Sequence, residues 1–508
     1  MKTVNEVLVK FYIIATLIVM PFYVENGYFN TLDAKAHIFW AASGVLMGAW
    51  AMFFVINFFM KMIAPAPKKI KNRGKKVEEP EALSKGFEFS LLDIAVLAFA
   101  AVSVISWLFS EYGDYALTGS QGWNIGAWTI VALAFTYFFV SRCYKHDNYL
   151  VVYIIGACLV LYLLALLNGL DIDPLAMHTK LAESEHFEYI ATIGNINSYS
   201  GYLSLTLPVI AFVFITDERK WLRILAGCAV FLGVTNLIVD NSDGAFLGAG
   251  VAFMFLIYYC LKDGALYKRM FAVGVLAASA CTFMMALVSA LGDKMVELSG
   301  ISAVVTKTPV CFGMLAVMII LFFVSQHFEG NIPAGVTKAL SIAFAVLCIA
   351  GIAAGVIYTA MHFSGKWGTK RGWIWGFALQ VFAGGSIKDK LVGVGPECFG
   401  IPVMDQFSDF ISEHWGKRIA NAHNEFLQYL VTMGILGLAA YVMTYASAFV
   451  SYLKTKVKDP VMLALFFAIM GYMGQAAVNN PQALNLATLF VFMGVFRAYE
   501  LGAKEVSA

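Results

Sequence analysis

The chain has 508 residues, of which 60% are hydrophobic and 13% are charged, and its formal net charge is +2 at pH 7. Soluble domains carry about 25% charged residues, so this chain has roughly half of their usual supply of side chains that face water. These values exclude a soluble protein of this length, and the small net charge gives no indication of nucleic-acid binding.

Apolar stretches recur along the whole chain, and each is close to the length of about 20 residues that a helix needs to cross a bilayer. Barrel strands do not give such continuous runs, because apolar and polar residues alternate in them. The sequence predicts an all-α polytopic membrane protein with about 14 transmembrane helices (12 to 14). The expected helices are 8–24, 36–60, 90–110, 124–141, 149–168, 199–215, 221–238, 243–261, 268–291, 308–326, 337–358, 425–452, 460–478 and 484–500.

The positive charges in the short connections predict which ends of the helices lie in the cytoplasm. Alternate connections at 25–35, 111–122 and 239–243 together contain one cation, Lys35, whereas the other connections are basic. Since cytoplasmic loops carry the excess of positive charge, we expect both termini inside the cell. The basic connections are KMIAPAPKKIKNRGKK (61–76), SRCYK (141–145), DERKWLR (217–223), KDGALYKR (262–269) and KTKVK (454–458).

The same alternation places two long connections outside the cell, at 169–198 and 359–424. A connection as long as the second is uncommon in a compact bundle and is usually functional, although a decorative outer domain is the alternative. Four parts are therefore expected. These are an N-terminal helix pair with a basic cytoplasmic linker (1–89), a transmembrane core (90–358), the large outer loop (359–424) with interfacial helices, and C-terminal transmembrane helices (425–508).

Acidic and imidazole side chains gather in the first of these long connections. Asp171 and Asp173 form a DxD motif, and HTKLAESEHFEY (178–189) adds two histidines and three glutamates. This composition fits either a metal site or a hydrated acidic loop. Because a two-residue motif often arises by chance, we expect the hydrated loop, with no metal and no other cofactor.

The large outer loop begins with SGKWGTKRGWIWGFALQVF (364–382), in which aromatic residues alternate with glycines and cations. This pattern is typical of a helix that lies in the headgroup layer of a membrane. Arg371 is expected at the start of this helix, either as a ligand for an anion or as an anchor that snorkels to the interface.

A glycine-containing turn follows in KDKLVGVGPECFG (388–400). Gly393, Gly395 and Pro396 predict a tight bend whose exposed backbone amides would hold an anionic group. The alternative is that these residues only punctuate the loop.

The loop ends in NAHNEFLQYL (421–430), where Asn421 is the expected N-cap of the next long helix. This cap places His423 in the first turn of that helix, at the outer membrane face. The positive helix end disfavours a protonated imidazole, so a neutral histidine there is suited to act as a general base. The alternative is that His423 is only a polar residue at a helix start.

The succession of these segments resembles the signature region of the O-antigen ligase and O-antigen polymerase family. The order and spacing of the motifs carry the resemblance, which covers most of the chain from about residue 90 onward and is most specific over 371–442. The similar segments are RGWIW (371–375), GVGPECF (393–399), AHNEFLQYL (422–430) with GILG (434–437), IGNINSYSGYLSLTLP (193–208) and NNPQALNLATLFVFMGVF (479–496).

The resemblance implies a metal-independent glycosyltransferase of the GT-C type that acts in the synthesis of surface polysaccharides. Such enzymes transfer a glycan from a polyprenyl (undecaprenyl) pyrophosphate to an acceptor hydroxyl on the outer face of the bacterial cytoplasmic membrane. In that family the His of the His-Asn pair acts on the acceptor hydroxyl, which corresponds to His423 beside Asn424. Arginines bind the pyrophosphate, which corresponds to Arg371.

The expected site therefore has His423 and Arg371 as catalytic residues. The expected substrate-binding residues are Asn424, Lys370, Arg418, Gly393, Gly395, Asn195 and Asn197. The asparagines at 195 and 197 would hydrogen-bond sugar hydroxyls or only cap the following helix, and the same two alternatives apply to Gln475, Asn479 and Asn480.

Two positions depart from the family pattern. Members often carry arginines where this chain has Trp123 and Asp243. Either Lys370, Lys417 or Arg418 supplies the missing positive charge, or the contacts to the donor differ, or activity is lost.

The expected partners are a polyprenyl-pyrophosphate-linked glycan donor, a glycan or lipid-linked glycan acceptor, and membrane lipids, with no nucleic acid. One alternative is a repeat-unit polymerase of the same family, which differs in its acceptor. An alternative of another class is a flippase or other carrier of lipid-linked glycans. A carrier would need a polar path between helices and internal repeats, and the sequence shows neither.

Overall fold

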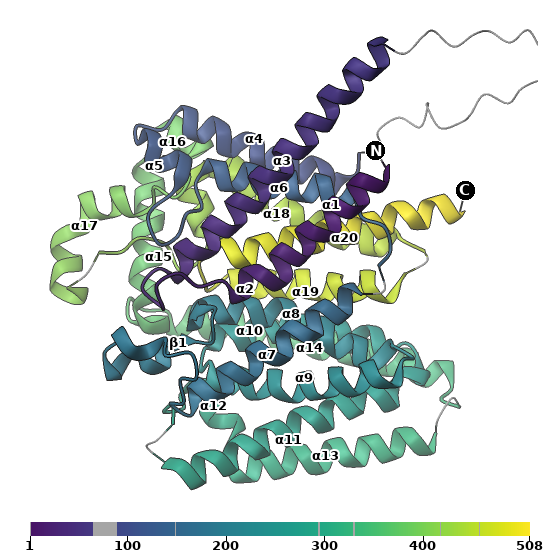
Figure 1. Cartoon of the computed structure of the whole chain (residues 1–508). Coiled ribbons are helices and arrows are strands. Elements are labelled where there is room, and N and C mark those ends of the chain that lie inside the picture. Colours follow the sequence, from purple (N-terminus) through teal and green to yellow (C-terminus); the bar gives the residue numbers. More distant parts are fainter. Residues whose placement is uncertain are drawn as a thin grey trace, which may run out of the picture.

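The protein is an all-α, multi-pass membrane protein, as predicted (Figure 1). The computed structural model describes residues 2–63, 89–147, 149–292, 295–328, 331–416, 418–456 and 458–507. Within these ranges an apolar helix lies at each of the predicted positions. Twelve of these helices are long and apolar enough to cross a membrane, and α6 and α19 are shorter, at 17 residues each.

The apolar helices are α1 (Lys2–Ile14), which continues through η1 (Ala15–Val19) and α2 (Met20–Phe22), then α3 (Thr31–Ile63), α4 (Leu91–Leu108), α6 (Ala127–Cys143), α7 (Leu150–Gly169), α8 (Ile196–Thr216), α9 (Lys220–Val239), α10 (Asp243–Cys260), α11 (Tyr267–Leu291), α13 (Thr308–His327), α14 (Ala334–His362), α18 (Glu425–Lys454), α19 (Pro460–Ala476) and α20 (Ala483–Ser507). The shorter elements are α5 (Gly113–Thr118), η3 (His178–Lys180), η4 (Glu183–Glu188), η5 (Gly264–Leu266), α12 (Gly300–Val305), α15 (Trp367–Gly384), α16 (Ile387–Val392) and α17 (Gly400–Trp415). Two short strands, β1 (Tyr189–Ile190) and β2 (Gly194–Asn195), pair antiparallel, with Tyr189 opposite Asn195.

Side-chain caps set the starts of several of these helices. The Ser90 hydroxyl accepts a hydrogen bond from the backbone N–H of Asp93 at the start of α4, and the Asp93 carboxylate accepts from the backbone N–H of Ser90 in return. At the start of α19 the Asp459 side chain accepts from the backbone N–H of Val461, and Pro460 occupies the first position. Both arrangements satisfy backbone donors that have no partner inside the helix.

The three C-terminal helices pack among helices from earlier in the chain (Figure 1). Helix α18 packs against α4, α20 packs against α6, and α19 packs against both α8 and α10. Side chains of α19 and of α20 up to Arg497 are therefore almost entirely buried, most of them in the main hydrophobic core. As a result, the start of α8 and the connection between α19 and α20 are neighbours, although they lie far apart in the sequence.

Helices α13 and α14 form the periphery of the bundle. Only 11% and 6% of their apolar windows are buried inside the protein. Large side chains such as Phe323 and Leu347 are 63% and 70% exposed. Apolar surfaces of this extent are unfavourable in water and favourable in lipid, so these helices face the bilayer.

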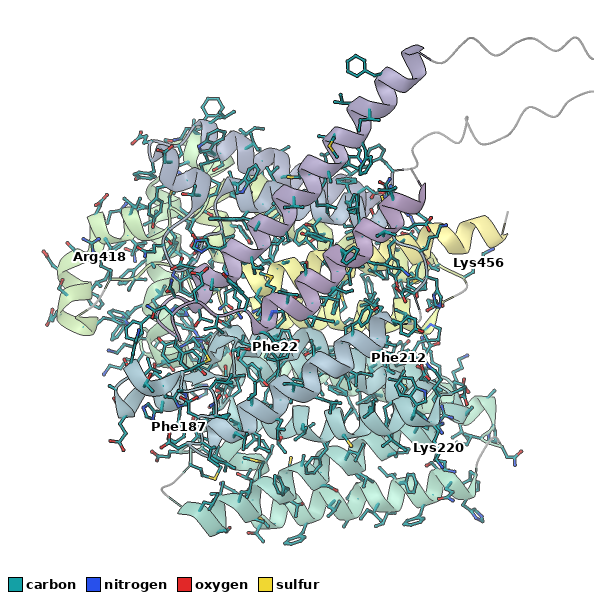
Figure 2. The ribbon with its side chains drawn as sticks, viewed as in Figure 1. Phe22, Phe187, Phe212, Lys220, Arg418 and Lys456 are labelled. Atoms are coloured by element: carbon teal, nitrogen blue, oxygen red, sulfur yellow. The ribbon has the colours of Figure 1, made fainter. Side chains whose placement is uncertain are left out.

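The connections gather at two opposite ends of the bundle, as the predicted alternation requires. Figure 2 shows Arg418 and Phe187, from the two long connections, at one end, and Lys220 and Lys456, from two basic loops, at the other. We call the first the loop end, which carries α15, α16, α17 and the β1–β2 hairpin. The charge bias predicts that it is extracytoplasmic. The basic linker 61–88, predicted to be cytoplasmic, falls almost entirely outside the described residues.

A buried ionic cluster joins α4, α6 and α20. The Asp93 carboxylate accepts hydrogen bonds from Arg497 (Nε···Oδ2 3.2 Å) and from the Tyr137 hydroxyl (2.8 Å), and it forms an ion pair with Arg142 (Nη2···Oδ1 2.9 Å). The side chains of Asp93 and Arg497 are both fully buried. Glu500 also pairs with Arg497 (Nη1···Oε2 2.8 Å), so two carboxylates compensate two cations that have little access to water.

Replacing Asp93 with alanine is expected to lower the free energy of unfolding by about 3 kcal/mol, the lower end for a broken buried ion pair, because Glu500 still pairs with the buried Arg497. Thermal unfolding of the purified protein in detergent measures the change. The matched control is Asp217→Ala, which removes a carboxylate that pairs with Arg219 near the surface and is expected to cost about 0–1 kcal/mol. Similar losses in both variants would contradict a special role for the buried cluster.

Candidate active site

Helix α15 places Arg371 at its start, as predicted. Three residues with positive φ, Gly368, Thr369 and Lys370, precede the regular part of the helix (φ 57°, 59° and 72°). They turn the chain so that Arg371 begins the helix and points its guanidinium toward the start of α8. Its Nη2 atom lies 3.5 Å from Oδ1 of Asn197.

Asn195 caps the start of α8, which is one of the two roles considered for it. Its Oδ1 atom accepts from the backbone N–H of Asn197 (2.9 Å) and from the side-chain amide of the same residue (3.0 Å). This fixes the Asn197 side chain with its oxygen toward Arg371. The cap therefore orients a residue that contacts the predicted anion-binding cation.

The start of α18 differs from the prediction. Asn424, not Asn421, is the N-cap: its Oδ1 accepts from the backbone N–H of Leu427 (3.0 Å), and its amide donates to the carbonyl of Ala477 (2.7 Å). His423 therefore precedes the helix instead of lying in its first turn, and it has a φ of 47°. Asn424 is thus bound within the protein by both ends of its side chain.

A chain of contacts joins His423 to Arg371 at the loop end. The Nδ1 atom of His423 lies 3.2 Å from Nδ2 of Asn480, whose backbone N–H donates to Oδ1 of Asn479 (3.1 Å). The Asn479 amide then donates to the backbone carbonyl of Asn197 (2.9 Å), and the Asn197 side chain meets Arg371. We call these five residues the polar chain. The two predicted catalytic residues therefore belong to one connected group of polar side chains.

Several buried polar atoms in and beside the polar chain have no hydrogen-bond partner among the residues that the structure describes. They are Ser198 Oγ, Asn480 Oδ1, Asn485 Oδ1 and Gln475 Oε1. Buried polar groups are rarely left unpaired, and each one has a free-energy cost. Three of the four are amide oxygens, so the interior beside the polar chain has a surplus of hydrogen-bond acceptors.

Burial and a nearby charge shift the pKa of Arg371 in opposite directions. Burial lowers its pKa, and the nearby carboxylate of Asp243 raises it. Asp243 is exposed at the start of α10, and its Oδ1 atom also accepts from the backbone N–H of Ile301 (3.3 Å). Asp243, one of the two positions where the resembled family often has an arginine, is therefore near Arg371 and carries the opposite charge.

Lys370 and Arg418 were predicted to bind substrate, and the structure gives neither a place in the polar chain. Lys370 donates to the backbone carbonyl of His414 (2.7 Å) and lies 5.2 Å from the ring centre of Trp415. It thus stabilises the end of α17, where a cation is favourable. Arg418 is exposed beyond α17, at the edge of the loop end (Figure 2). Lys417 lies outside the described residues.

The prediction that the amides of Gly393 and Gly395 hold an anion is wrong. The N–H of Gly393 donates to the carbonyl of Asp389 (2.8 Å), and the N–H of Gly395 donates to the carbonyl of Thr432 (3.0 Å). The intervening N–H of Val394 also donates to α18. These amides are already paired, so the turn packs against α18 instead of binding a ligand.

Glu397 is a buried carboxyl group that the sequence did not single out. It lies between α16 and α17, is 4% exposed and has a φ of 64°. Burial raises its pKa to about 8, while the backbone N–H of Ile125 lowers it. In the sequence its only signal is an acidic residue within a turn of glycine, proline and cysteine.

As the pH rises, the Glu397→Gln variant is expected to become increasingly stable relative to the wild type. An acid whose pKa is higher in the folded state binds its proton more tightly there, so its contribution to stability falls between the ordinary value of 4.5 and about 8. The advantage of the glutamine variant grows over this range by up to about 1.4 kcal/mol per pH unit. Thermal unfolding from about pH 5 to 8 tests this, with Glu413→Gln in α17 as the control. A difference that does not change with pH would exclude this titration.

Glu425 is a second buried acidic residue that sequence reasoning missed. It opens α18 two residues after His423, and it accepts hydrogen bonds from the hydroxyls of Tyr441 and Tyr472 (2.7 Å for Tyr472). Tyr472 belongs to α19, so Glu425 fastens the start of α18 to that helix. The acidic residue in AHNEF therefore fixes the helix start that directly follows His423.

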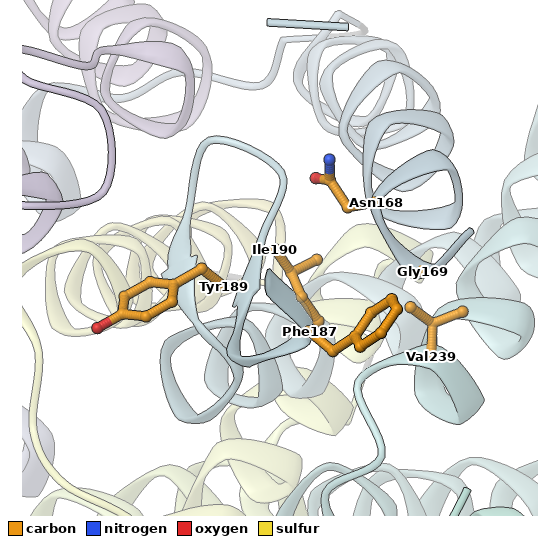
Figure 3. A pocket seen from close by; sticks show the side chains of 6 residues that line it. All are labelled: Asn168, Gly169, Phe187, Tyr189, Ile190 and Val239. Carbon is orange, nitrogen blue, oxygen red and sulfur yellow. The ribbon is translucent and has the colours of Figure 1, made fainter. Parts of the chain in front are cut away.

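A small depression at the loop end is lined by Asn168, Gly169, Phe187, Tyr189, Ile190 and Val239 (Figure 3). It has essentially no room for a water molecule, whereas typical ligand pockets have roughly 300–1,000 Å³. None of the residues that line it belongs to the polar chain. It is therefore not a site for a glycan.

Comparison with known proteins leaves the family as a prediction. No protein-family model and no curated protein matches this chain significantly. The functional assignment consequently depends on the geometry of the polar chain and on the quoted motifs.

The chemistry available at the polar chain is limited to a few groups. It contains one guanidinium, one imidazole and three amide side chains, all at the loop end. A guanidinium matches the oxygens of a phosphate or carboxylate, and an imidazole transfers protons near neutral pH. The polar chain thus contains both a cation that can bind an anionic group and an imidazole that can accept a proton.

Proposed function

We propose that this protein is a membrane glycosyltransferase similar to the O-antigen ligases. It would transfer a glycan from a polyprenyl pyrophosphate to an acceptor hydroxyl on the outer face of the bacterial cytoplasmic membrane. The observation that supports this proposal is the polar chain, which connects Arg371 and His423 at the end of the bundle predicted to be extracytoplasmic.

In this proposal Arg371 binds the diphosphate of the donor. Its guanidinium stays charged and presents paired donors to phosphate oxygens, and partial burial strengthens such contacts. When the bond between the sugar C1 and the diphosphate oxygen breaks, the bonding electrons leave with the diphosphate. A fixed cation stabilises the charge that develops on this leaving group.

His423 is the proposed general base for the acceptor. Its Nε2 atom takes the proton of the acceptor hydroxyl as the hydroxyl oxygen forms its bond to C1, so that the new glycosidic bond replaces the bond to the diphosphate. For Nε2 to accept this proton, Nδ1 must carry the hydrogen of the neutral ring. The Asn480 amide must then turn its oxygen toward Nδ1, and this oxygen is the atom of Asn480 that is buried without a partner.

The acceptor is either a lipid-linked sugar core or a second lipid-linked repeat unit, the latter giving a polymerase. Both acceptors offer a neutral hydroxyl, so the same polar chain serves either reaction. Deleting the gene distinguishes them: loss of attached glycan on an intact core indicates a ligase, and single repeat units in place of long chains indicate a polymerase.

Reconstitution tests the proposal directly against a transporter. Purified protein in liposomes receives a polyprenyl-pyrophosphate donor with a labelled glycan and a hydroxyl-bearing acceptor. We expect labelled acceptor and released polyprenyl pyrophosphate without addition of a divalent cation. Movement of the donor between leaflets with no covalent product would replace the transferase by a carrier.

A further inference from the structure

A second group of titratable side chains lies at the loop end, apart from the polar chain. Asp171 follows α7, His178 opens η3 and His186 lies in η4. Their ligating atoms, one carboxylate oxygen and one nitrogen from each ring, all lie within 4.8 Å of one another. We call these three residues the imidazole cluster.

His178 is the unusual member of this cluster. It is 4% exposed, and neither of its ring nitrogens has a hydrogen-bond partner among the residues described. The nearest carboxylate oxygen, Oδ2 of Asp173, lies 4.0 Å from Nδ1 and accepts instead from the backbone N–H of His178 (2.6 Å). A buried imidazole with two unpaired nitrogens carries a desolvation cost that a bound ligand would remove.

The other two members of the cluster, Asp171 and His186, contact each other, and His186 also contacts His178. Nδ1 of His186 lies 3.0 Å from Oδ1 of Asp171, and the rings of His186 and His178 are stacked with centres 4.8 Å apart and an angle of 18°. Asp171 and His186 are partly exposed, so an ion can reach them from solvent. The cluster is therefore both accessible and backed by a buried ligand.

We propose that the imidazole cluster binds one divalent transition-metal ion of the Zn²⁺ type. Two imidazole nitrogens and one carboxylate oxygen form a ligand set typical of zinc, and they leave one position for water. This assignment replaces the hydrated loop expected from the sequence. Ca²⁺ and Mg²⁺ prefer oxygen donors, so neither is the ion that we expect to bind to two imidazole nitrogens.

Binding requires a small movement of side chains. Two ligand atoms on one tetrahedral zinc lie about 3.4 Å apart, given metal–ligand bonds of about 2.1 Å. Each imidazole nitrogen binds in the plane of its ring, so the two rings must tilt out of their parallel stack. His186 is partly exposed and therefore freer to rotate than the buried His178, so we expect its side chain to make this movement.

The ion would fasten the loop that leads to the polar chain. Asp171 and His186 are 15 residues apart, so the ion closes this segment into a ring. His178 also stacks on Tyr28 (5.5 Å), whose hydroxyl donates to the carbonyl of Ala191 in the β1–β2 hairpin. That hairpin ends at Asn195. Metal binding itself does not depend on the proposed transferase activity.

Zinc titration of the full-length protein tests this inference. The protein is purified in detergent with a tag that contains no histidine, stripped with a chelator, and titrated with Zn²⁺ by calorimetry. We expect one saturable site per chain and a rise in the unfolding temperature on addition of Zn²⁺. The double variant His178→Ala/His186→Ala is expected to lose more than about 100-fold in affinity for Zn²⁺. Removing a group that only supports a metal ligand typically costs about 10- to 100-fold. His362→Ala, which removes an exposed histidine at the end of α14, is the matched control and should bind as the wild type does.

Spectroscopy of the wild type keeps the test independent of whether the variants fold. Co²⁺ in place of Zn²⁺ is expected to give the intense visible absorption of a tetrahedral site with nitrogen and oxygen ligands. X-ray absorption of the zinc form is expected to show two imidazoles. The absence of a saturable site, equal binding by the double variant, or a metal environment without imidazole would each overturn the proposal.

Discussion

Replacing His423 with alanine is expected to lower the rate of glycan transfer by about 100- to 10,000-fold, while the protein still reaches the membrane. The imidazole is the group of the polar chain suited to take the acceptor proton, and alanine has no atom that does so. The helix start remains intact because Asn424, not His423, caps α18. Transfer by the purified variant in liposomes measures the loss, and membrane fractionation checks that the protein is inserted.

The control for this variant is His362→Ala, which removes an exposed histidine and is expected to keep the wild-type rate. A His423→Ala protein that transfers glycan at the wild-type rate would remove the histidine from the mechanism. If the His423→Ala protein does not reach the membrane, His423→Gln replaces it in the test. This variant keeps a polar side chain and is expected to be equally inactive.

Asn480 provides a finer readout of the same mechanism, because in the proposed reaction it positions His423 and does not touch the substrate. Asn480→Asp keeps an oxygen that accepts from Nδ1–H, so we expect it to retain much of the transfer rate. Asn480→Leu has a similar size but no acceptor, so we expect slower transfer. Equal losses in both variants would contradict the orienting role.

The transmembrane helices could be predicted from the sequence because the bilayer imposes their length. An apolar run near 20 residues has one stable arrangement in lipid, since its backbone groups must be paired within the segment. The prediction 36–60 corresponds to α3 (Thr31–Ile63), and 425–452 corresponds to α18 (Glu425–Lys454). The polar residues at helix ends extend these helices beyond the apolar runs.

The partners inside the candidate site could not be predicted in the same way. His423 and Asn480 are 57 residues apart, and Asn197 and Asn479 are 282 residues apart. No local periodicity relates such residues, because their contact is set by how α18, α19 and α8 pack. The N-cap was also misplaced, since Asn421 and Asn424 have equal capping tendency and only the fold decides between them.

The prediction of an anion site at the Gly393–Gly395 turn was wrong for a related reason. Helix α18 is interrupted where this turn packs against it. Gly434 has a φ of 67° and a ψ of −169°, which interrupts the helix within its apolar run. Carbonyls next to the break lack their helical partners, and in a bilayer no water replaces them. The carbonyls of Val431 and Thr432 instead accept from the amides of Val394 and Gly395 (3.2 and 3.0 Å). The sequence signals a turn, but not the broken helix that uses it.

Replacing Gly393 with alanine is therefore expected to destabilise the protein by at least about 3 kcal/mol, through backbone strain and overlap together. The φ of Gly393 is 80°, and an added Cβ would lie 2.2 Å from the carbonyl carbon of Thr432. The overlap is with backbone, so no side chain can rotate away to relieve it. Gly434→Ala is expected to behave in the same way, since its Cβ would lie 2.3 Å from the carbonyl carbon of Leu391.

Gly384→Ala is the matched control, because an added Cβ there meets nothing within 4 Å and the residue lies in helix α15. The unfolding temperature in detergent and the yield of monodisperse protein are the measurements. Since the turn holds the half of α18 that begins beside His423, we expect the Gly393 variant to lose glycan transfer together with stability. Equal stability of the Gly393 and Gly384 variants would show that the turn does not support the broken helix.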